Sequence, residues 1–349
     1  MRIAIIAITG NGAKLAARLQ RGIPESRLFV IDKHASGEAE PFPSGLRALV
    51  ARLWPEYGGF VFLMATGIVV RTVAPLLQAK ERDPAVVVLD DAGRFAISLL
   101  SGHLGGANQL AKRCAELVGA TPVITTATDV NDLPSFDMLA KENGWLIEDL
   151  TRVKVLNALL LEGKEIAVVD HRDAVRSYCD GKGVLSFHGD IAGALRSGAS
   201  GHLLVTNSLL PRQCDSDRTL VLRPRNLCLG IGCNRGTSAA EIESVVLANL
   251  ERLSLSLKSV KCVATAQAKR DEVGLLAWAG SCNFPIRFYQ SDLLNGVEMP
   301  SPPSAHAFAA IGARGVAEPA ALLASGGGRL ILNKVKDGNV TLAIAETVI

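Results

Sequence analysis

Short apolar segments alternate with amphipathic patterns along the first third of the chain. Four segments rich in valine, isoleucine and phenylalanine have the length and composition of buried strands. These predicted strands are residues 2–8, 27–32, 59–65 and 85–90. The predicted helices between them are residues 13–20, 46–54 and 67–79. Strands that alternate with helices favour a mostly parallel sheet covered by helices on both faces.

The same alternation continues along the rest of the chain. Further strands are predicted at residues 165–170, 201–207, 227–232, 259–265, 329–335 and 340–347. Further helices are predicted at residues 151–164, 237–253, 268–280 and 316–325. Residues 131–135 close the first domain, and the polar stretch 208–219 reads as a linker. We therefore expect a multi-domain α/β protein with mostly parallel sheets covered by helices and a separate C-terminal α/β domain. The predicted domains are residues 1–135, 136–222 and 223–349.

Composition narrows the classes of function. The 349 residues carry a net charge of +3 and 5% aromatic residues, so a nucleic-acid groove is not expected. The longest apolar run, residues 60–70, is too short to span a bilayer, and the apolar start of the chain reads as a strand and not as a signal peptide. Seven scattered cysteines without a C-x-x-C pair are typical of reduced thiols. We expect a cytoplasmic protein with no membrane or nucleic-acid partner and no metal held by protein ligands.

A histidine stands among three glycines in "LLSGHLGGANQLA", residues 99–111, where an apolar run gives way to a helical pattern. The N-terminus of a helix offers free backbone N–H groups that favour a carboxylate or an oxyanion. His103 beside them could exchange protons near neutral pH. Its candidate partners in the loop are Ser101, Gly102, Gly105, Gly106 and Asn108. A helix cap with a packed or solvated histidine is the alternative, and it stays open.

A second candidate loop lies at residues 123–132, where a predicted strand stops at hydroxyl groups and an acid. These residues are Thr125, Thr126, Thr128 and Asp129. Such side chains at the carboxyl end of a strand can orient a polar ligand. An ordinary turn, in which the side chains bond their own backbone, explains the pattern equally well.

A third candidate loop, at residues 229–243, has the order strand, glycine loop, helix. Ser238 and Glu241 have the spacing of a capping box, which places the helix start directly after the loop. The loop residues that could face an anion are Gly230, Gly232 and Arg235. The loop lacks the complete dinucleotide fingerprint and the Walker ending, so nucleotide binding is weakly supported. Cys233 has no histidine near it in the sequence and is interpreted as a buried cysteine.

Charged residues at two further strand ends complete the candidates. Lys269 and Glu272 follow one predicted strand, and Lys334 ends another. The lysines could pair with ligand carboxylates, with solvated loop charges as the alternative. The residues by themselves thus predict an α/β protein with two glycine loops suited to anions and a polyanionic ligand.

These motifs resemble a known family over nearly the whole chain. The segments "DDAGRFAISLLSGHLGGANQLA" and "PVITTATDV" resemble the N-terminal part of the cobalt-precorrin 5A hydrolase family of anaerobic cobalamin biosynthesis. The C-terminal domain of that family is similar to "GIGCNRGTSAAEIE", "ATAQAKRDEVGL", "GVAEPAALL" and "LILNKVKDGNVTLAIAE". Asn234 stands where the family loop often has a basic residue.

The resemblance implies a substrate and a reaction. The substrate is a cobalt-bound, ring-contracted tetrapyrrole with many acetate and propionate groups, in which a δ-lactone joins the ring A acetate to the extruded meso carbon. Water opens the lactone, and the two-carbon unit leaves as acetaldehyde to give cobalt-precorrin 5B. Since cobalt travels in the substrate, no cofactor is expected. The other expected partners are neighbouring pathway enzymes, through transient contacts.

We infer residue roles from this chemistry. Lactone hydrolysis builds an oxyanion and needs a base for water. His103 is the expected base, and Thr126 and Asp129 are the expected catalytic partners that orient substrate or water. The expected substrate cradle is Ser101, Gly102, Gly105, Gly106, Asn108 and Thr125. The residues expected to hold peripheral carboxylates are Gly230, Gly232, Arg235, Lys269, Glu272 and Lys334.

Two other interpretations remain open. The same loops would serve a non-catalytic carrier that passes a labile tetrapyrrole between enzymes. A nucleotide-dependent enzyme is less consistent with the incomplete glycine motif.

Overall fold

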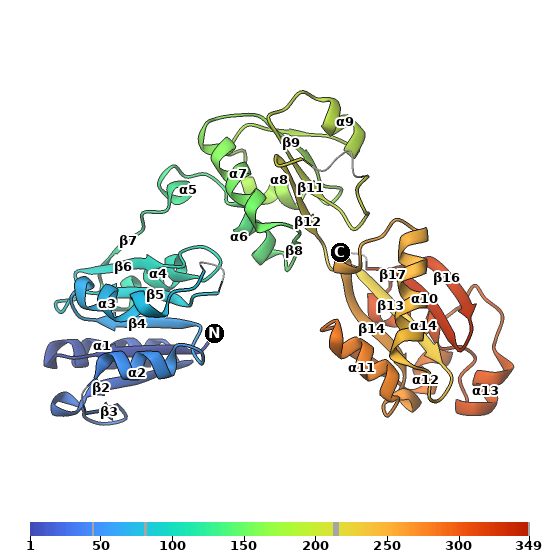
Figure 1. The fold of residues 1–349 in the computed structure, drawn as a ribbon, viewed down its shortest axis with the longest axis horizontal. Coiled ribbons are helices and arrows are strands. Elements are labelled where there is room, and N and C mark those ends of the chain that lie inside the picture. The colour runs from blue at the N-terminus through green and yellow to red at the C-terminus, as the bar shows by residue number, and fades with distance from the viewer. Residues whose placement is uncertain (44, 80–81, 212–215, 348–349) are drawn as a thin grey trace. The chain divides into compact units, whose positions relative to one another are not determined.

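The computed structural model describes residues 1–43, 45–79, 82–211 and 216–347. Their contacts divide the chain into two compact units. The N-terminal unit is residues 1–139 with 179–183, and the C-terminal unit is residues 140–178 with 184–349. Three sheets flanked by helices make up these units (Figure 1). The predicted α/β class is therefore confirmed, while the boundaries of the three predicted domains stay a prediction.

The N-terminal unit is built on one seven-stranded sheet of order β3-β2-β1-β4-β5-β6-β7. Its strands are β1 Ile3–Ala7, β2 Ser26–Ile31, β3 Glu40–Phe42, β4 Gly59–Leu63, β5 Ala85–Leu89, β6 Phe95–Leu100 and β7 Thr121–Val123. The first five strands are parallel, β6 is antiparallel to β5, and β7 is parallel to β6. The carboxyl ends of β6 and β7 therefore lie at the opposite edge of the sheet from those of β1, β4 and β5.

Helices cover both faces of this sheet, as the alternating pattern predicts. The covering helices are α1 Gly10–Gly22, α2 Leu46–Leu53, α3 Thr66–Val73 and α4 Ala107–Val118. The chain continues with α5 Ala127–Val130 and with α6 Phe136–Glu142, which crosses the boundary between the two units. Helices α1 and α4 pack on one face, and α2 and α3 pack on the other. The predicted helix 67–79 ends earlier, at Val73, because Pro75 lacks an amide and favours the short 3₁₀ turn Ala74–Leu76.

Two five-stranded sheets form the C-terminal unit. The middle sheet has the order β10-β9-β11-β12-β8. Its strands are β8 Leu146–Ile147, β9 Ile166–Val169, β10 Leu185–Phe187, β11 Gly201–Val205 and β12 Thr219–Arg223, and its helices are α7 Leu150–Leu161, α8 Ala174–Cys179 and α9 Ile191–Arg196. Strands β10, β9, β11 and β12 are parallel, and β8 is antiparallel. Part of the predicted linker, residues 212–215, lies outside the described residues.

The last sheet has the order β15-β14-β13-β17-β16. Its strands are β13 Leu227–Cys233, β14 Val260–Ala266, β15 Ile286–Tyr289, β16 Arg329–Asp337 and β17 Val340–Glu346. Its helices are α10 Ala239–Arg252, α11 Val273–Ser281, α12 Ser291–Asn295, α13 Ala305–Ile311 and α14 Ala317–Ser325. Helices α10 and α11 cover one face, and α14 covers the other. The predicted helix 268–280 starts later, at Val273, after a separate 3₁₀ turn at Gln267–Lys269.

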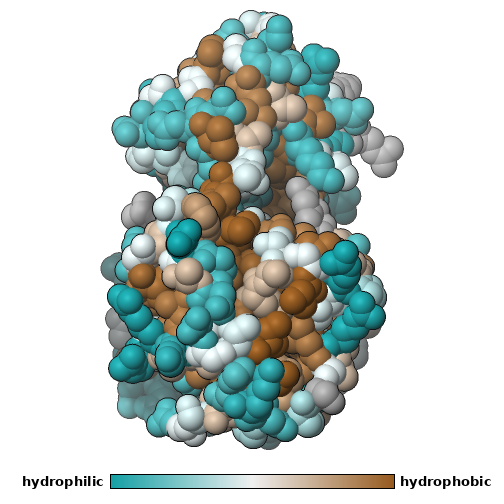
Figure 2. Space-filling model, turned by 90° about the vertical axis from the view of Figure 1, so that its left-hand side faces the viewer, coloured by the Kyte–Doolittle hydropathy of each residue, from teal (hydrophilic) through white to brown (hydrophobic). Residues whose placement is uncertain are grey.

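Within the described residues, no helix combines the length and apolarity needed to cross a membrane. Large apolar side chains that are exposed in the N-terminal unit include Ile68, Val70, Phe95 and Val130. On the face drawn in Figure 2, apolar residues lie in groups between hydrophilic ones.

Candidate functional site

The glycine loop between β6 and α4 folds back tightly on itself. The amide of Gly106 donates to the carbonyl of His103 over 2.9 Å, that of Ala107 to Ser101 over 3.1 Å, and that of Asn108 to Gly102 over 3.0 Å. Helix α4 follows directly, with Gly106 as its N-cap. Three backbone amides at the start of α4, which were expected to bind an oxyanion, thus already donate to carbonyls of the same loop.

The glycines of this loop are explained by close packing. A Cβ on Gly102 would lie 2.7 Å from Oδ1 of Asn108, and a Cβ on Gly105 would lie 2.3 Å from Cβ of Ser101. Gly106 has φ of +92°, a conformation that side chains disfavour. The glycines therefore let the loop close around Asn108, and the closed loop presents the side chain of His103.

His103 lies between two carboxylates. Its Nε2 is 3.0 Å from Oδ2 of Asp129, and its Nδ1 is 3.4 Å from Oδ2 of Asp137. The side chains of His103 and Asp137 are 16% and 7% exposed, against 28% for Asp129, so Asp129 is the member more open to solvent. Two hydroxyls complete the contacts: Thr128 Oγ1 lies 3.2 Å from Nε2, and Ser135 Oγ lies 3.2 Å from Nδ1.

The two carboxylates favour the protonated imidazole. The hydrogen bond to Asp137 and the charges of Asp137 and Asp129 raise the pKa of His103, against the opposing effect of burial. Burial of Asp137 would raise the pKa of that carboxyl, but hydrogen bonds from His103 and Ser135 and the charge of His103 lower it to about 2. His103 is thus held in its protonated form. A protonated imidazole can act as an acid at the start of a reaction, but it cannot act as the base that the sequence predicted.

Asn108 joins this cluster to the sheet. Its Nδ2 donates to Thr126 Oγ1 over 2.9 Å and to Asp129 Oδ2 over 3.0 Å, while Ser98 on β6 donates to its Oδ1 over 2.7 Å. Asn108 is 6% exposed. Because β6 and β7 end at the same edge, the two loops predicted separately from the sequence meet here. We call His103, Asn108, Thr126, Thr128, Asp129, Ser135 and Asp137 the His103 cluster.

Asp137 and Ser135 belong to the cluster although the sequence pattern did not predict them, whereas the predicted Thr125 lies outside it. Thr125 is exposed. Asp137 starts α6, in the segment assigned to the next domain, yet the contacts place it in the N-terminal unit. The short spacing of Ser135 and Asp137 after a proline at the start of a helix is the only local signal that could have drawn attention to them.

A pocket of about 400 Å³ in the C-terminal unit gathers most of the predicted C-terminal residues. Gly232, Arg235, Lys269 and Lys334 all line it. Residues that the sequence analysis did not single out, His306 and Lys336 among them, line it as well. Small apolar residues from β14, α13 and the start of α14 form much of the rest of its wall, with polar residues such as Asn234, Ser304 and Thr341 among them. We call this cavity the C-terminal pocket.

Three cations of the C-terminal pocket each contact an oxygen atom of a neighbouring residue, and they differ in how far they are exposed to solvent. Lys269 Nζ lies 3.2 Å from Oε2 of Glu272, and both side chains are mostly buried. Lys334 donates from Nζ to the carbonyl of Pro302 over 3.2 Å. Arg235, 71% exposed, pairs with Asp271 over 3.1 Å. An apolar wall with basic groups at its edge can receive a ligand that is apolar over its face and acidic around its periphery.

Two predicted binding residues lie outside the lining of this pocket. A Cβ on Gly230 would lie 1.8 Å from the carbonyl oxygen of Ala317, so this glycine allows α14 to pack against β13. Glu272, 4% exposed, accepts from the amide of Gly236 over 2.6 Å and orders the glycine loop.

The predicted helix cap is present, and the predicted capping box is incomplete. Ser238 Oγ accepts from the amide of Glu241 over 3.2 Å, as predicted. The carboxylate of Glu241, however, accepts from the amide of Asn339 over 2.9 Å and does not turn back to its own helix. The tight turn between β16 and β17 therefore competes for this side chain.

The cysteines give no nucleophile at either site. Cys233 is half-buried and lines the C-terminal pocket, so its interpretation as a buried cysteine is wrong. Partial burial still raises the pKa of its thiol, which disfavours the reactive thiolate. Six cysteines are free thiols, and Cys214 lies outside the described residues. Among the described residues, no three histidine, cysteine, aspartate or glutamate side chains are grouped to hold a metal ion.

Three family models match consecutive parts of the chain. The model described as "Cobalamin synthesis G N-terminal" matches residues 48–129, "Cobalamin biosynthesis central region" matches residues 134–224, and "Cobalamin synthesis G C-terminus" matches residues 227–345.

Curated relatives match over nearly the full chain. A cobalt-precorrin-5A hydrolase of Priestia megaterium is 38% identical over 98% of this chain and 94% of its own. A cobalt-precorrin-5A hydrolase of Salmonella typhimurium is 32% identical over 98% of this chain and 97% of its own. A solved cobalamin biosynthesis protein G homologue from Sulfolobus solfataricus is 23% identical, with a TM-score of 0.38 over 99% of this chain and 97% of its own.

Proposed function

The chain belongs to the cobalt-precorrin-5A hydrolase family of cobalamin biosynthesis and is a hydrolase of that kind, and we propose that the His103 cluster carries out its chemistry. The single observation that supports this assignment is the placement of His103 between Asp129 and Asp137. One imidazole with a carboxylate at each ring nitrogen can hold, give and retake a proton without moving. The carrier interpretation is not retained, because the curated relatives are named as hydrolases.

In the first step, Asp129 accepts the proton of the water that attacks the lactone carbonyl. Both hydrogen bonds described for its carboxylate reach Oδ2, so Oδ1 is the oxygen available for water among the described residues. His103, kept protonated by Asp137, gives its Nε2 proton to the ring oxygen that leaves as the lactone opens. This order assigns His103 as an acid first, in place of the base expected from the sequence.

In the second step, the same histidine works in the opposite direction. The hydroxyl that lactone opening releases must lose its proton as the carbon–carbon bond breaks, and the macrocycle accepts the electron pair. His103, neutral after the first step, takes that proton back, and acetaldehyde leaves. The proton of His103 thus returns to the place where it started, Asp129 releases the proton it took from water to solvent, and Asp137 keeps the imidazole in one orientation throughout.

The C-terminal pocket binds the acidic periphery of the substrate in this proposal. Lys269, Lys334 and Lys336 line a cavity whose remaining wall is largely apolar, which fits a macrocycle with carboxylate side chains. Cobalt arrives within the substrate, and neither a resident metal nor an organic cofactor takes part in the steps above.

We place the reaction in the cytoplasm, where reduced cysteines persist, with transient transfer contacts to neighbouring pathway enzymes.

The test is acetaldehyde release from cobalt-precorrin 5A in single turnover, followed against pH. If His103 is the acid of the first step, the rate falls as pH rises through its raised pKa, and His103→Asn abolishes that limb. A His103→Asn variant that folds, binds substrate and releases acetaldehyde at the unmodified rate would place the chemistry elsewhere. Thermal unfolding and substrate binding of the same variant are the controls.

A further inference from the structure

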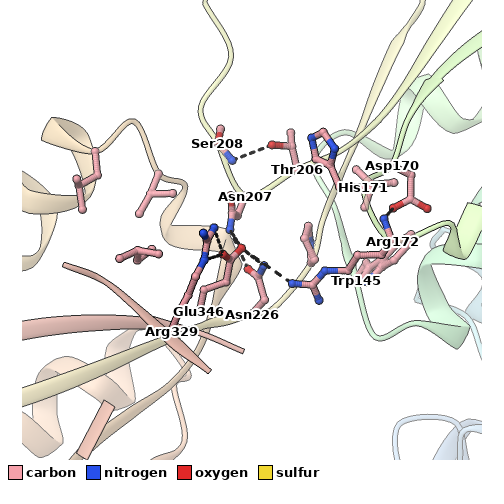
Figure 3. Close-up of a pocket in the computed structure, with 15 residues that line it drawn as sticks. Trp145, Asp170, His171, Arg172, Thr206, Asn207, Ser208, Asn226, Arg329 and Glu346 are labelled. Carbon is pink, nitrogen blue, oxygen red and sulfur yellow. Dashed lines mark hydrogen bonds and ion pairs between the residues drawn. The ribbon is translucent and has the colours of Figure 1, made fainter. Parts of the chain in front are cut away.

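A second pocket, of about 370 Å³, opens at the carboxyl edge of the middle sheet (Figure 3). The loop after β9 contributes Asp170, His171 and Arg172, and the loop after β11 contributes Thr206, Asn207 and Ser208. The last sheet supplies Arg329 and Glu346 on the other side of the pocket. None of these residues belongs to the His103 cluster or to the C-terminal pocket.

The topology of the middle sheet singles out this position. The chain leaves β9 toward β10 on one side, and it leaves β11 toward β12 on the other side. Since β9 and β11 are neighbouring parallel strands, their two loops diverge at a topological switch point. Open α/β sheets bind ligands in the crevice that such diverging loops form. The pocket occupies that crevice.

The two carboxylates of the pocket are already bonded to the protein. Asp170 accepts from the amide of Arg172 over 3.1 Å and from the amide of Val175 over 2.8 Å. Glu346 Oε1 accepts from Asn207 and Asn226 over 2.9 Å each, and its Oε2 accepts from Arg329 over 3.0 Å. Both carboxylates are therefore tied to the protein, as Figure 3 shows for Glu346.

Some hydrogen-bond donors of the pocket, in contrast, have no acceptor in the described part of the protein. Nη1 of Arg172 is buried and has no hydrogen-bond partner among the described residues. Nη2 of the same side chain donates to the carbonyl of Thr347 over 3.3 Å and lies 4.0 Å from Oε1 of Glu346. Arg329 is 78% exposed and uses Nε and Nη2 toward Glu346, which leaves part of its five-donor guanidinium for a ligand. His171, also exposed, lies beside them.

We infer that this pocket is a binding site for a carboxylate-bearing small molecule, held by Arg172 and Arg329. Carboxylates that are already bonded and unfilled guanidinium donors call for a ligand that brings acceptor oxygens, and guanidinium groups bind carboxylates in two-pronged fashion. Two sources share this chemistry: a peripheral carboxylate of the tetrapyrrole and a free organic acid. The inference rests on the middle sheet and its loops, and it does not depend on the role proposed for His103.

Trp145 lines the pocket and gives a local signal. The full chain is titrated with citrate, and tryptophan fluorescence is read. We expect a saturable change that is lost in Trp145→Phe and unaltered in Lys334→Ala, which tests the C-terminal pocket separately. Arg329→Gln, at an exposed position, should weaken the change at least roughly tenfold, as expected for loss of a charged hydrogen bond. Arg172→Gln should do the same, with thermal unfolding as its control.

The matched control is Arg196→Gln, an exposed arginine on α9 outside the pocket, which removes the same charge. Equal citrate affinity in Arg329→Gln and in Arg196→Gln would overturn the inference, as would the absence of a saturable signal. Competition between citrate and cobyrinic acid, a stable corrinoid with several carboxylates, identifies the tetrapyrrole periphery as the source, and independent binding identifies a free acid. Acetaldehyde release is measured in parallel, so that failure of the proposed catalytic role is seen separately.

Discussion

The His103 cluster holds its charges in one closed network, whereas in the C-terminal pocket Lys269 and Arg235 each pair with a single carboxylate, Glu272 and Asp271. In the cluster, the charged groups bind one another: His103 contacts Asp129 and Asp137, and Asn108 ties Asp129 to the sheet. In the pocket, basic side chains stand at the edge of a largely apolar cavity, and Arg235 is 71% exposed. A fixed network sets the positions of protons and should therefore affect the rate of the chemical step. Cations at the edge of a cavity can bind the substrate equally in the ground state and the transition state, and should therefore affect binding.

The comparison predicts its largest effect at His103. His103→Ala should lower the rate of acetaldehyde release by about 10²- to 10⁴-fold, because a positioned acid–base group contributes that much. KM should change little, since the imidazole contacts the cluster and not the substrate periphery. Stopped assays with cobalt-precorrin 5A measure both constants. Near-full turnover would leave Asp129 as the main acid–base residue, and loss of folding by circular dichroism would favour a structural role.

Asp137→Asn should have the next largest effect, because it removes the main cause of the raised pKa of His103. With that pKa lowered, the imidazole loses its proton at a lower pH, so the alkaline limb of the rate profile should move to lower pH. On the alkaline side of the limb, we expect Asp137→Asn to react more slowly than the natural chain, because less of its imidazole is protonated there. An unmoved limb would mean that another group titrates there.

The same variant gives a second, independent reading through stability. The pKa of Asp137 is about 2 in the folded protein, below its ordinary 3.8. Its ionised form therefore stabilises the fold above pH 3.8, and this contribution is lost as pH falls toward 2. Asp137→Asn should lose less stability than the natural chain over this window, as measured by urea unfolding at several pH values. Parallel curves for the two proteins would contradict the ion pair.

Lys334→Ala tests the other side of the comparison. Because a contact to a peripheral carboxylate is made in both ground and transition states, its loss should raise KM and leave kcat near its natural value. An increase of roughly tenfold corresponds to one charged hydrogen bond. Lys164→Ala, an exposed lysine outside the pocket, is the matched control. A collapse of kcat at unchanged KM would instead place Lys334 at the reacting centre.

Arg235→Ala should have the smallest effect, an increase in KM of about two- to threefold with unchanged kcat, since exposed ion pairs contribute little. Its side chain is 71% exposed and already paired with Asp271. Steady-state kinetics at two salt concentrations measure the effect, which should shrink as salt rises. An effect larger than that of Lys334→Ala would reverse the order of the two residues.

Strongly apolar runs were predictable from the sequence. Strands β1, β4 and β5 are buried along their whole length and read as continuous apolar segments. Helix α10 begins at the residue after the Ser238 cap, as its spacing indicates. These elements depend on the composition of a few neighbouring residues, which can be read from the sequence without the tertiary structure.

Strand β6 was not predicted, and it decides where the histidine lies. Its residues are half-buried for the most part, so the period of two is blurred. Because it runs antiparallel to β5, it carries the glycine loop to the edge opposite the acidic turn at Asp90 and Asp91. Without this strand, the sequence pattern still predicts the loop directly before α4. It does not indicate at which edge of the sheet the loop lies.

By itself, the sequence determined the fold class, the family and the two segments that bring His103, Thr126 and Asp129. It did so because apolar periodicity and motif spacing are properties of neighbouring residues. Tertiary structure alone decided that Asp137, far along the chain, completes the cluster, that the glycines serve close packing, and that Glu272 orders a loop. The contacts of Asp137 and Glu272 join different segments of the chain, and the packing of the glycines depends on the backbone path of a closed loop. Both are set by three-dimensional distances that arise only when the sheet and its helices have packed.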